Sequence, residues 1–143
     1  MLGTGGGPAP WQDADPFDLP DWLGTREVTW TSSSALRASA LVAGELSAAD
    51  EEPVGCDLLA VDEAYPVPVA DDDLRTAAHQ AWRRGDVHLG SRGGRLTLAV
   101  PGSGIDADRT LDAVARLAKS VGASPSSYAV CLRLGQDGRR ADR

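Results

Sequence analysis

The chain has 143 residues, of which 42% are hydrophobic and 24% charged, and 21 acidic against 14 basic side chains give a formal net charge of -7. This length fits one domain with a core that needs no disulfide bonds, and the composition excludes a collagenous, wholly disordered or membrane-embedded protein. The acidity disfavours nucleic-acid binding by the chain as a whole. With two cysteines, no secretion signal and no apolar stretch of about 18 residues, the sequence predicts a cytoplasmic protein without membrane contact.

The charges are segregated along the chain. Residues 38–74 contain ten acidic residues and no basic one, whereas residues 75–143 contain 12 basic and 6 acidic residues. Charge asymmetry of this kind can mark a partner surface. The interpretation that we favour is that the two halves neutralise each other, across one sheet or between subunits.

Residues 1–25 are predicted to form an irregular acidic arm, because they combine glycines, prolines and aspartates without a clean periodicity. In this arm Trp11, Phe17, Leu19 and Trp22 are interleaved with carboxylates, a composition typical of segments that fold onto partners. The favoured alternative is that Phe17, Leu19 and Trp22 hold the arm on the protein's own core, since large apolar side chains seldom stay in water.

Three strands are expected before the first helix. Alternation of apolar and polar residues predicts the first, and the continuous apolar run at residues 58–61 gives the third a central position in the sheet. The strands are placed at residues 27–31, at 36–42 as the hairpin partner of the first, and at 56–64, with an acidic loop over 44–55.

The second half of the chain predicts two helices and a hairpin. Aspartates precede the first helix and a glycine follows each helix, as capping requires. The last element is open between strand and helix, and its alternation favours a strand. The expected elements are a helix at 71–84, paired strands at 87–89 and 95–100, a helix at 106–121, the ambiguous element at 128–134, and a disordered tail at 136–143.

This order implies an α+β fold over residues 26–135, with a mostly antiparallel sheet and two helices packed on one face. The sequence of elements is three strands, a helix, two strands, a helix and a final strand or helix. In this order and in its acidity the chain resembles small secretion-chaperone-like domains, which are acidic dimers. The resemblance implies a homodimer as one expectation.

Candidate chemistry is sparse. Neither His79 nor His88 has a positioned partner nearby in the sequence, and the two cysteines lie in apolar runs where a thiol acts as a small hydrophobe. The glycine runs do not join a strand to a helix, as a phosphate loop must. An enzyme or small-ligand domain would need His79, Cys131 or Asp62 to converge in one pocket. The sequence therefore predicts no cofactor, metal site or catalytic residue.

One basic constellation remains, formed by Arg83, Arg84, Arg92 and Arg95 beside Trp82. As a single patch, these arginines would suit an acidic protein surface or phosphate groups. They also suit a solvated strand edge, where charges prevent pairing with other chains. The aromatic platform that single-stranded nucleic acids use is missing, which disfavours nucleic acid without excluding it.

These observations favour a non-enzymatic protein-interaction, adaptor or regulatory domain, with residues 11–23 and 83–95 as contact segments. The alternatives are nucleic-acid binding through the four arginines, and a small ligand-binding domain or enzyme. The candidate partner-binding residues are Arg83, Arg84, Arg92, Arg95, Trp82, Trp11, Phe17 and Trp22.

Overall fold

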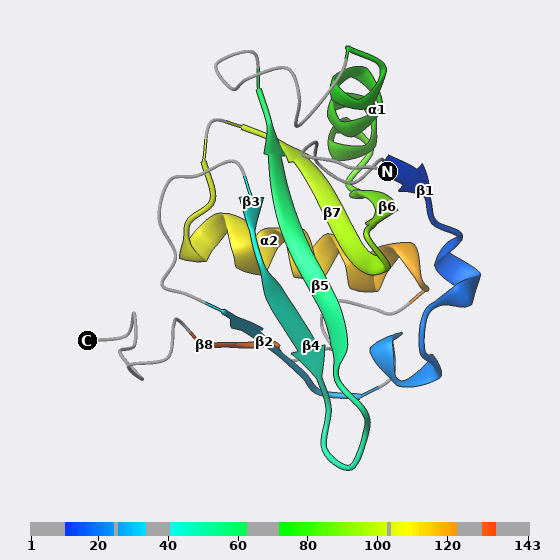
Figure 1. The fold of residues 1–143 in the computed structure, drawn as a ribbon, viewed down its shortest axis with the longest axis vertical. Helices are drawn as coiled ribbons and strands as arrows, with labels where there is room; N and C mark the ends of the chain where they lie inside the picture. Colours follow the sequence, from blue (N-terminus) through cyan, green and yellow to red (C-terminus); the bar gives the residue numbers. More distant parts are fainter. Residues whose placement is uncertain are drawn as a thin grey trace, which may run out of the picture.

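The computed structural model describes residues 11–24, 26–33, 41–62, 72–102, 104–122 and 130–133. They form one mixed sheet with two α-helices (Figure 1). The elements in chain order are β1 (Trp11–Asp13), the short 3-10 helices η1 (Pro16–Asp18) and η2 (Asp21–Gly24), β2 (Val28–Ser32), β3 (Leu41–Val42), β4 (Gly44–Ser47), β5 (Val54–Val61), α1 (Asp72–Arg83), β6 (His88–Arg92), β7 (Arg95–Pro101), α2 (Ala107–Ser120) and β8 (Val130–Arg133).

The strand order is β1-β6-β7-β5-β4-β2-β8, and β3 also pairs with β5. Neighbouring strands are antiparallel except for the pairs β5–β7 and β2–β8, which are parallel. The predicted α+β class and mostly antiparallel sheet are therefore confirmed. β3 and β4 keep one register against β5, with Leu41 opposite Leu59 and Glu45 opposite Gly55, so they form an interrupted strand.

The central strands β5 and β7 are buried on both sides. Leu58, Ala60 and Leu98 belong to the large core cluster that contains Val114 and Leu117 of α2. Leu59, Val61 and Ala99 form a second cluster with Leu74 and Ala78 of α1. Because side chains alternate along a strand, the two helices cover opposite sides of these strands.

The layering thus differs in one respect from the expected pair of helices on one face. The physical reason lies in the continuous apolar run of β5, which leaves no polar face for water and needs cover on both sides. Figure 1 shows α2 crossing behind β5 and β7, with α1 beside one end of these strands.

Local sequence signals explain the helices and the β6–β7 hairpin. Asp106 caps α2, because its side chain accepts a hydrogen bond from the backbone N–H of Arg109 at 2.8 Å. Gly93 and Gly94 have φ angles of 62° and 81°, and glycine adopts such angles without strain in the two-residue turn between β6 and β7. The predicted helices and hairpin are confirmed to within a few residues.

Two strand predictions need correction. Residues 44–47 were expected in a loop but form β4, in which Gly44 and Leu46 are buried and Glu45 is exposed. The antiparallel partner of β2 is this strand, and β3 pairs with β5 instead. A single apolar side chain, Leu46, gave the acidic stretch too little alternation to be recognised as a strand.

The last described element is a strand, β8, as the alternation favoured, and it lies parallel to β2. The predicted tail at 136–143 and most of the predicted strand at 36–42 fall outside the described residues. Within the part of the chain that the structure describes, none of the helices has the length and apolar character needed to cross a membrane.

Candidate functional site

The first part of the N-terminal arm docks on the edge of the sheet. β1 pairs antiparallel with β6, with Trp11 opposite Arg92, and the N–H of Ala14 donates to the carbonyl of Leu89 at 3.3 Å. The indole of Trp11 stacks on the His88 imidazole, with ring centroids 5.3 Å apart and planes 15° apart. The same indole lies over Gly90 so closely that a Cβ at this position would overlap it. The contact therefore depends on an aromatic ring facing a glycine.

The second anchor of the arm is η2, whose Trp22 and Leu23 are buried in the main core cluster. Between the two anchors, η1 begins at the cap residue Asp15, whose carboxylate accepts a hydrogen bond from the N–H of Phe17 at 3.0 Å. The phenyl ring of Phe17 points into solvent and is 94% exposed. Phe17 thus lies on a structured turn held at both ends, rather than on a loose chain.

Exposed carboxylates precede and follow Phe17 along the arm. They belong to Asp13, Asp15, Asp18 and Asp21, and residues 11–24 contain no basic residue. We call Phe17 and these four aspartates the Phe17 surface. Its chemistry is one exposed aromatic ring among negative charges.

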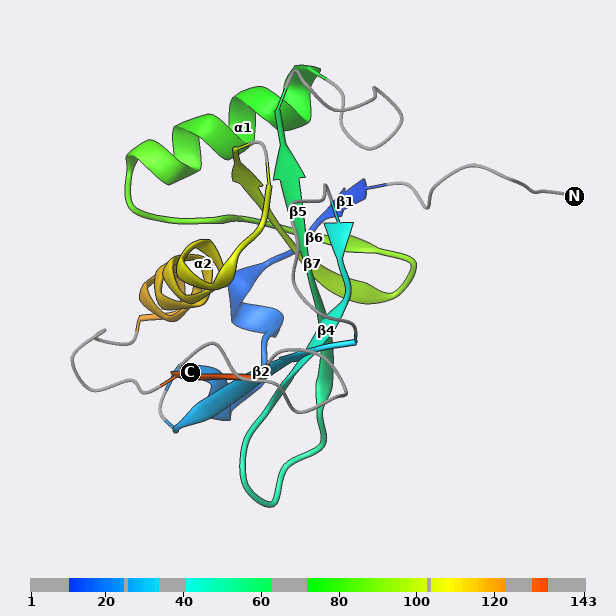
Figure 2. The same ribbon diagram turned by 90° about the vertical axis from the view of Figure 1, so that its left-hand side faces the viewer.

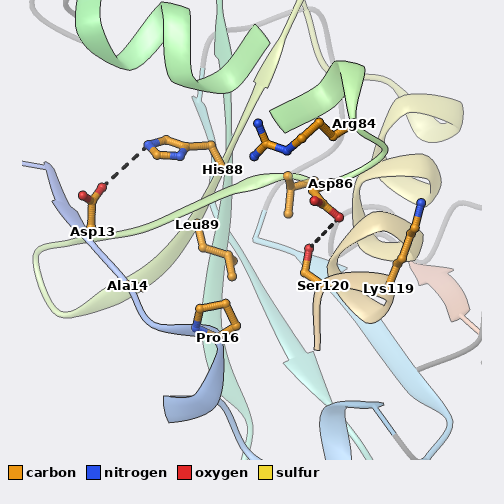
Figure 3. A pocket seen from close by; sticks show the side chains of 10 residues that line it. Asp13, Ala14, Pro16, Arg84, Asp86, His88, Leu89, Lys119 and Ser120 are labelled. Atoms are coloured by element: carbon orange, nitrogen blue, oxygen red, sulfur yellow. Dashed lines mark hydrogen bonds and ion pairs between the residues drawn. The ribbon is translucent and has the colours of Figure 1, made fainter. Parts of the chain in front are cut away.

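An open cleft of about 600 Å³ lies where the arm, β6 and the C-terminal ends of both helices meet (Figure 3). Figure 3 shows Arg84 and Lys119 extending from the ends of the helices, near Asp86 and Ser120. Ser120 Oγ lies 3.4 Å from Asp86 Oδ1, and His88 Nε2 lies 3.7 Å from Asp13 Oδ1. Partial burial lowers the pKa of His88 from 6.5, although the charge of Asp13 acts in the opposite direction.

This cleft carries charges of both signs. Arg84 and Lys119 are balanced by Asp13 and Asp86, and the pKa shift of His88 favours its neutral form. Equal numbers of cations and carboxylates select neither an anionic nor a cationic ligand. The cleft lies between the docked arm and the helix ends, and its charges do not indicate a class of ligand.

The structure does not bring the four candidate arginines into one cluster. Arg83 and Arg84 are exposed at the end of α1, whereas Arg92 and Arg95 flank the β6–β7 turn. Figure 2 shows the end of α1 and this turn at opposite ends of β6. The five residues of β6 span about 13 Å at the usual rise of a strand.

The guanidinium of Arg95 is paired with a carboxylate on the neighbouring strand β5. Its Nε and Nη2 lie 3.1 Å and 2.9 Å from Asp57 Oδ1, and Nη2 also donates to the carbonyl of Gly44. These hydrogen bonds to Asp57 raise the pKa of Arg95 above its ordinary value. The Arg95 guanidinium therefore has a structural partner on β5.

The aromatic candidates occupy three different environments. Trp11 is half-buried on β6, Trp22 is buried in the core, and Phe17 is exposed. Trp82, half-buried on α1, lies under the guanidinium of Arg116, 3.5 Å from the ring centroid. Among the aromatic candidates, Phe17 alone presents its ring to solvent.

The residues considered for catalysis lie on separate elements. His79 is exposed on α1, Asp62 follows β5, and Cys131 lies on β8 at the edge of the sheet. Burial raises the pKa of the Cys56 thiol far above its ordinary value, which keeps it protonated and unreactive. Within the described ranges, no group of three or more histidine, cysteine or acidic side chains is placed to hold a metal ion.

The sequence selected both segments of the docking contact and favoured an arm held on the protein's own core, as Trp22 and Leu19 are. The expectation was wrong for Phe17, which is exposed, and it did not include the pairing of the two segments with each other. Residues 11–13, from the first predicted contact segment, pair with residues 90–92 of the second. Gly90 and Asp13 were not among the candidates. The available signals were a glycine inside a strand, which often marks close approach of another group, and an acid two residues after a tryptophan.

Comparisons of the chain with protein-family models, curated proteins and solved structures find no match.

Proposed function

We propose that this protein is a non-enzymatic protein-interaction domain, and that the Phe17 surface is its contact site. The partner is a protein that offers an apolar pocket for the phenyl ring within a basic surface. The observation that carries the proposal is the 94% exposure of Phe17 on a turn anchored at both ends.

The anchoring supports binding because it lowers the entropy lost when the complex forms. Trp11 is held on β6 and Trp22 in the core, so the turn between them is ordered before the partner arrives. A preorganised contact residue loses less conformational freedom on binding than one on a mobile chain. Aromatic anchors that fill a pocket are also the residues that most often dominate interface energies.

The carboxylates support the choice of partner. Aspartates around an aromatic ring speed association with a basic surface and disfavour acidic ones, through complementary charge. Nucleic acid is not part of this proposal, because Arg83 and Arg84 are distant from Arg92, and Arg95 is bound to Asp57. A cytoplasmic site of action stays within the proposal, supported by Cys56, which is a buried free thiol in the core.

The proposal is tested by replacing the exposed ring. Wild-type protein and Phe17→Ser are used to capture proteins from the source cells, and any protein retained in stoichiometric amount is purified and titrated calorimetrically. We expect Phe17→Ser to weaken the Kd by about 30-fold, the effect of losing one central aromatic anchor of about 2 kcal/mol. Asp18→Lys should slow association and reduce its dependence on salt.

The matched control is Leu111→Ser, which removes another exposed apolar side chain, 37% accessible and located on α2. This variant should bind the partner with the wild-type Kd. The proposal is overturned if wild-type protein retains no stoichiometric partner, or if the Kd of the retained partner is the same for Phe17→Ser as for wild type.

A further inference from the structure

Within the described sheet, the outer side of β6 is covered only by β1, a very short edge strand. β1 has three residues, and the hydrogen bond from Ala14 to Leu89 extends the contact by one more. A strand of this length opens at low free-energy cost, because few backbone hydrogen bonds and few buried side chains hold it. When β1 leaves, the edge of β6 is free to pair with another strand.

The surface beneath β1 is specific for its side chains. Trp11 and Asp13 lie on the same face of β1, since alternate residues share a face, and they meet His88 and Gly90 of β6. The missing side chain at Gly90 makes room for the indole, and His88 stacks against it. Asp13 Oδ1 accepts a hydrogen bond from Trp11 Nε1 at 3.3 Å, which fixes the ring orientation. The β6 edge thus recognises an extended segment with an aromatic residue and an acid two positions later.

We propose that this edge of β6 accepts residues 11–13 of a second copy of the chain, so that two molecules pair by exchanging their arms. A second copy carries the same Trp11 and Asp13, and therefore reproduces every contact of the docked arm. Exchange of an identical element is a low-cost route to a dimer.

Two further features favour the second copy as the occupant. The arm precedes β2, so its exchange leaves the pairing of the other strands unchanged. The arm is also acidic, while Arg92 lies directly opposite Trp11, and Arg83 and Arg84 follow at the end of α1. The charges of the arm therefore complement the region of the second copy that it would approach.

In wild-type protein the arm of the same molecule competes for the edge. A tethered segment has an effective concentration in the millimolar range, so exchange between wild-type molecules appears only in concentrated solution. A complementary pair of full-length variants removes this competition. Trp11→Gly keeps the β6 edge but lacks the indole, whereas Gly90→Ala keeps the indole but fills the space beneath it.

The experiment is sedimentation equilibrium of each variant alone and of an equimolar mixture. We expect each variant alone to be monomeric and the mixture to form a heterodimer at concentrations at least 10-fold below those at which wild type self-associates. The double variant Trp11→Gly/Gly90→Ala has neither the indole nor the space beneath it. It should therefore pair with neither of the two single variants. The proposal is overturned if the mixture is monomeric at every concentration at which each variant alone is monomeric.

A second measurement tests the proposal without the Gly90→Ala variant, in case this variant does not fold. A labelled peptide with the sequence of residues 9–15 is titrated into full-length Trp11→Gly, and binding is followed by fluorescence anisotropy. The peptide should bind, and the same peptide with glycine in place of the tryptophan should bind at least 10-fold more weakly. Equal binding of the two peptides contradicts recognition by the β6 edge.

If the tryptophan peptide binds but the two folded variants do not pair, the β6 edge recognises the arm sequence and the second copy is rejected as its occupant. The outcome can be told apart from that of the Phe17 proposal, because pairing and peptide binding are measured without the partner of Phe17. Both variants loosen the Trp11 anchor of the Phe17 turn but keep the phenyl ring, so they are not used to test the Phe17 surface.

Discussion

Asp57 is a carboxylate in the buried centre of the sheet, with a side chain only 9% exposed. It accepts hydrogen bonds from the Arg95 guanidinium and, at 3.1 Å, from the backbone N–H of Gly44. Gly44 begins β4, where the interrupted strand resumes after β3. The carboxylate therefore supplies the acceptor that this N–H lacks at the interruption.

We expect Asp57→Ala to lower the free energy of unfolding by about 2 kcal/mol, because it leaves the buried N–H of Gly44 without its acceptor and removes the ion pair of Arg95, whose guanidinium keeps its hydrogen bond to the carbonyl of Gly44. Urea unfolding measures this change. Arg92→Ala, opposite Arg95 in the hairpin, is the control and should change stability by about 0.5 kcal/mol or less. Equal losses for the two variants would show that the ion pair does not stabilise the fold.

His88 makes the docking of the arm depend on pH. Burial lowers the pKa of His88 below 6.5 in the docked state, against the charge of Asp13, and the stacked indole of Trp11 is one of the groups that cover the imidazole. We therefore expect the docked state to bind fewer protons than the open one, in which the indole has left. Docking is then strongest above pH 6.5 and weakens as the pH falls through 6.5 towards the lower docked value. Hydrogen exchange at the N–H of Ala14, corrected for its intrinsic pH dependence, should show more frequent opening in acid.

His88→Gln is the control for this prediction, since glutamine keeps a polar side chain on β6 without titrating in this range. The opening free energy of its arm should be the same on both sides of pH 6.5. A pH-independent opening in the wild type would contradict a role for His88 protonation.

Among the elements, α2 has the best-defined start. The extended backbone of Asp106 and its hydrogen bond to the N–H of Arg109 satisfy one of the free donors of the first turn. We expect Asp106→Ala to destabilise the protein by about 1 kcal/mol, which lowers the Tm by about 4 °C at this chain length. Thermal unfolding followed by circular dichroism measures the change.

The matched control for the cap is Asp108→Asn, which removes an exposed carboxylate from the same turn without removing the cap. It loses only the interaction of a charge with the helix dipole, about 0.3–1 kcal/mol at low salt, and this loss should vanish at high salt. The cap assignment is rejected if Asp106→Ala behaves in the same salt-dependent way.

The sequence predicted those helices and strands whose own residues show a cap, an apolar stripe or an alternation of apolar and polar side chains. Both helices have acidic starts and apolar stripes, and in the sequence of β7 large apolar residues alternate with Thr97 and Ala99, so each element was placed from the sequence although β7 is buried on both faces. β4 was missed because Leu46 is its one large apolar residue. The layering was missed because periodicity shows that β5 is buried but not which helix covers which side.

At the scale of the whole molecule, long-range partners escaped prediction. Arg95 was expected in a basic surface patch, yet its partner is Asp57, 38 residues earlier. Trp11 and Gly90 are brought together only by the pairing of β1 with β6. Gly90 indicates that some group approaches β6 closely, but the local sequence does not indicate which segment approaches, since edge strands with similar alternation can pair in several registers.

The segregated charges do meet within one copy at the centre of the sheet. β5 belongs to the acidic stretch and β7 to the basic one, and the two strands are parallel neighbours joined by the pair Asp57–Arg95. The two halves of the chain therefore depend on each other for the most buried part of the fold.

The parallel pairing of β2 with β8 sets the order in which the protein can fold. β2 carries the buried side chains of Val28 and Trp30, and its second neighbour comes from residues 130–133, about a hundred positions later. While the ribosome is still adding the intervening residues, one edge of β2 has no partner strand. Contacts that close such long loops are formed slowly. The sheet is therefore completed only after residue 133 has left the ribosome, and until then the unpaired edge of β2 is open to pairing with other chains.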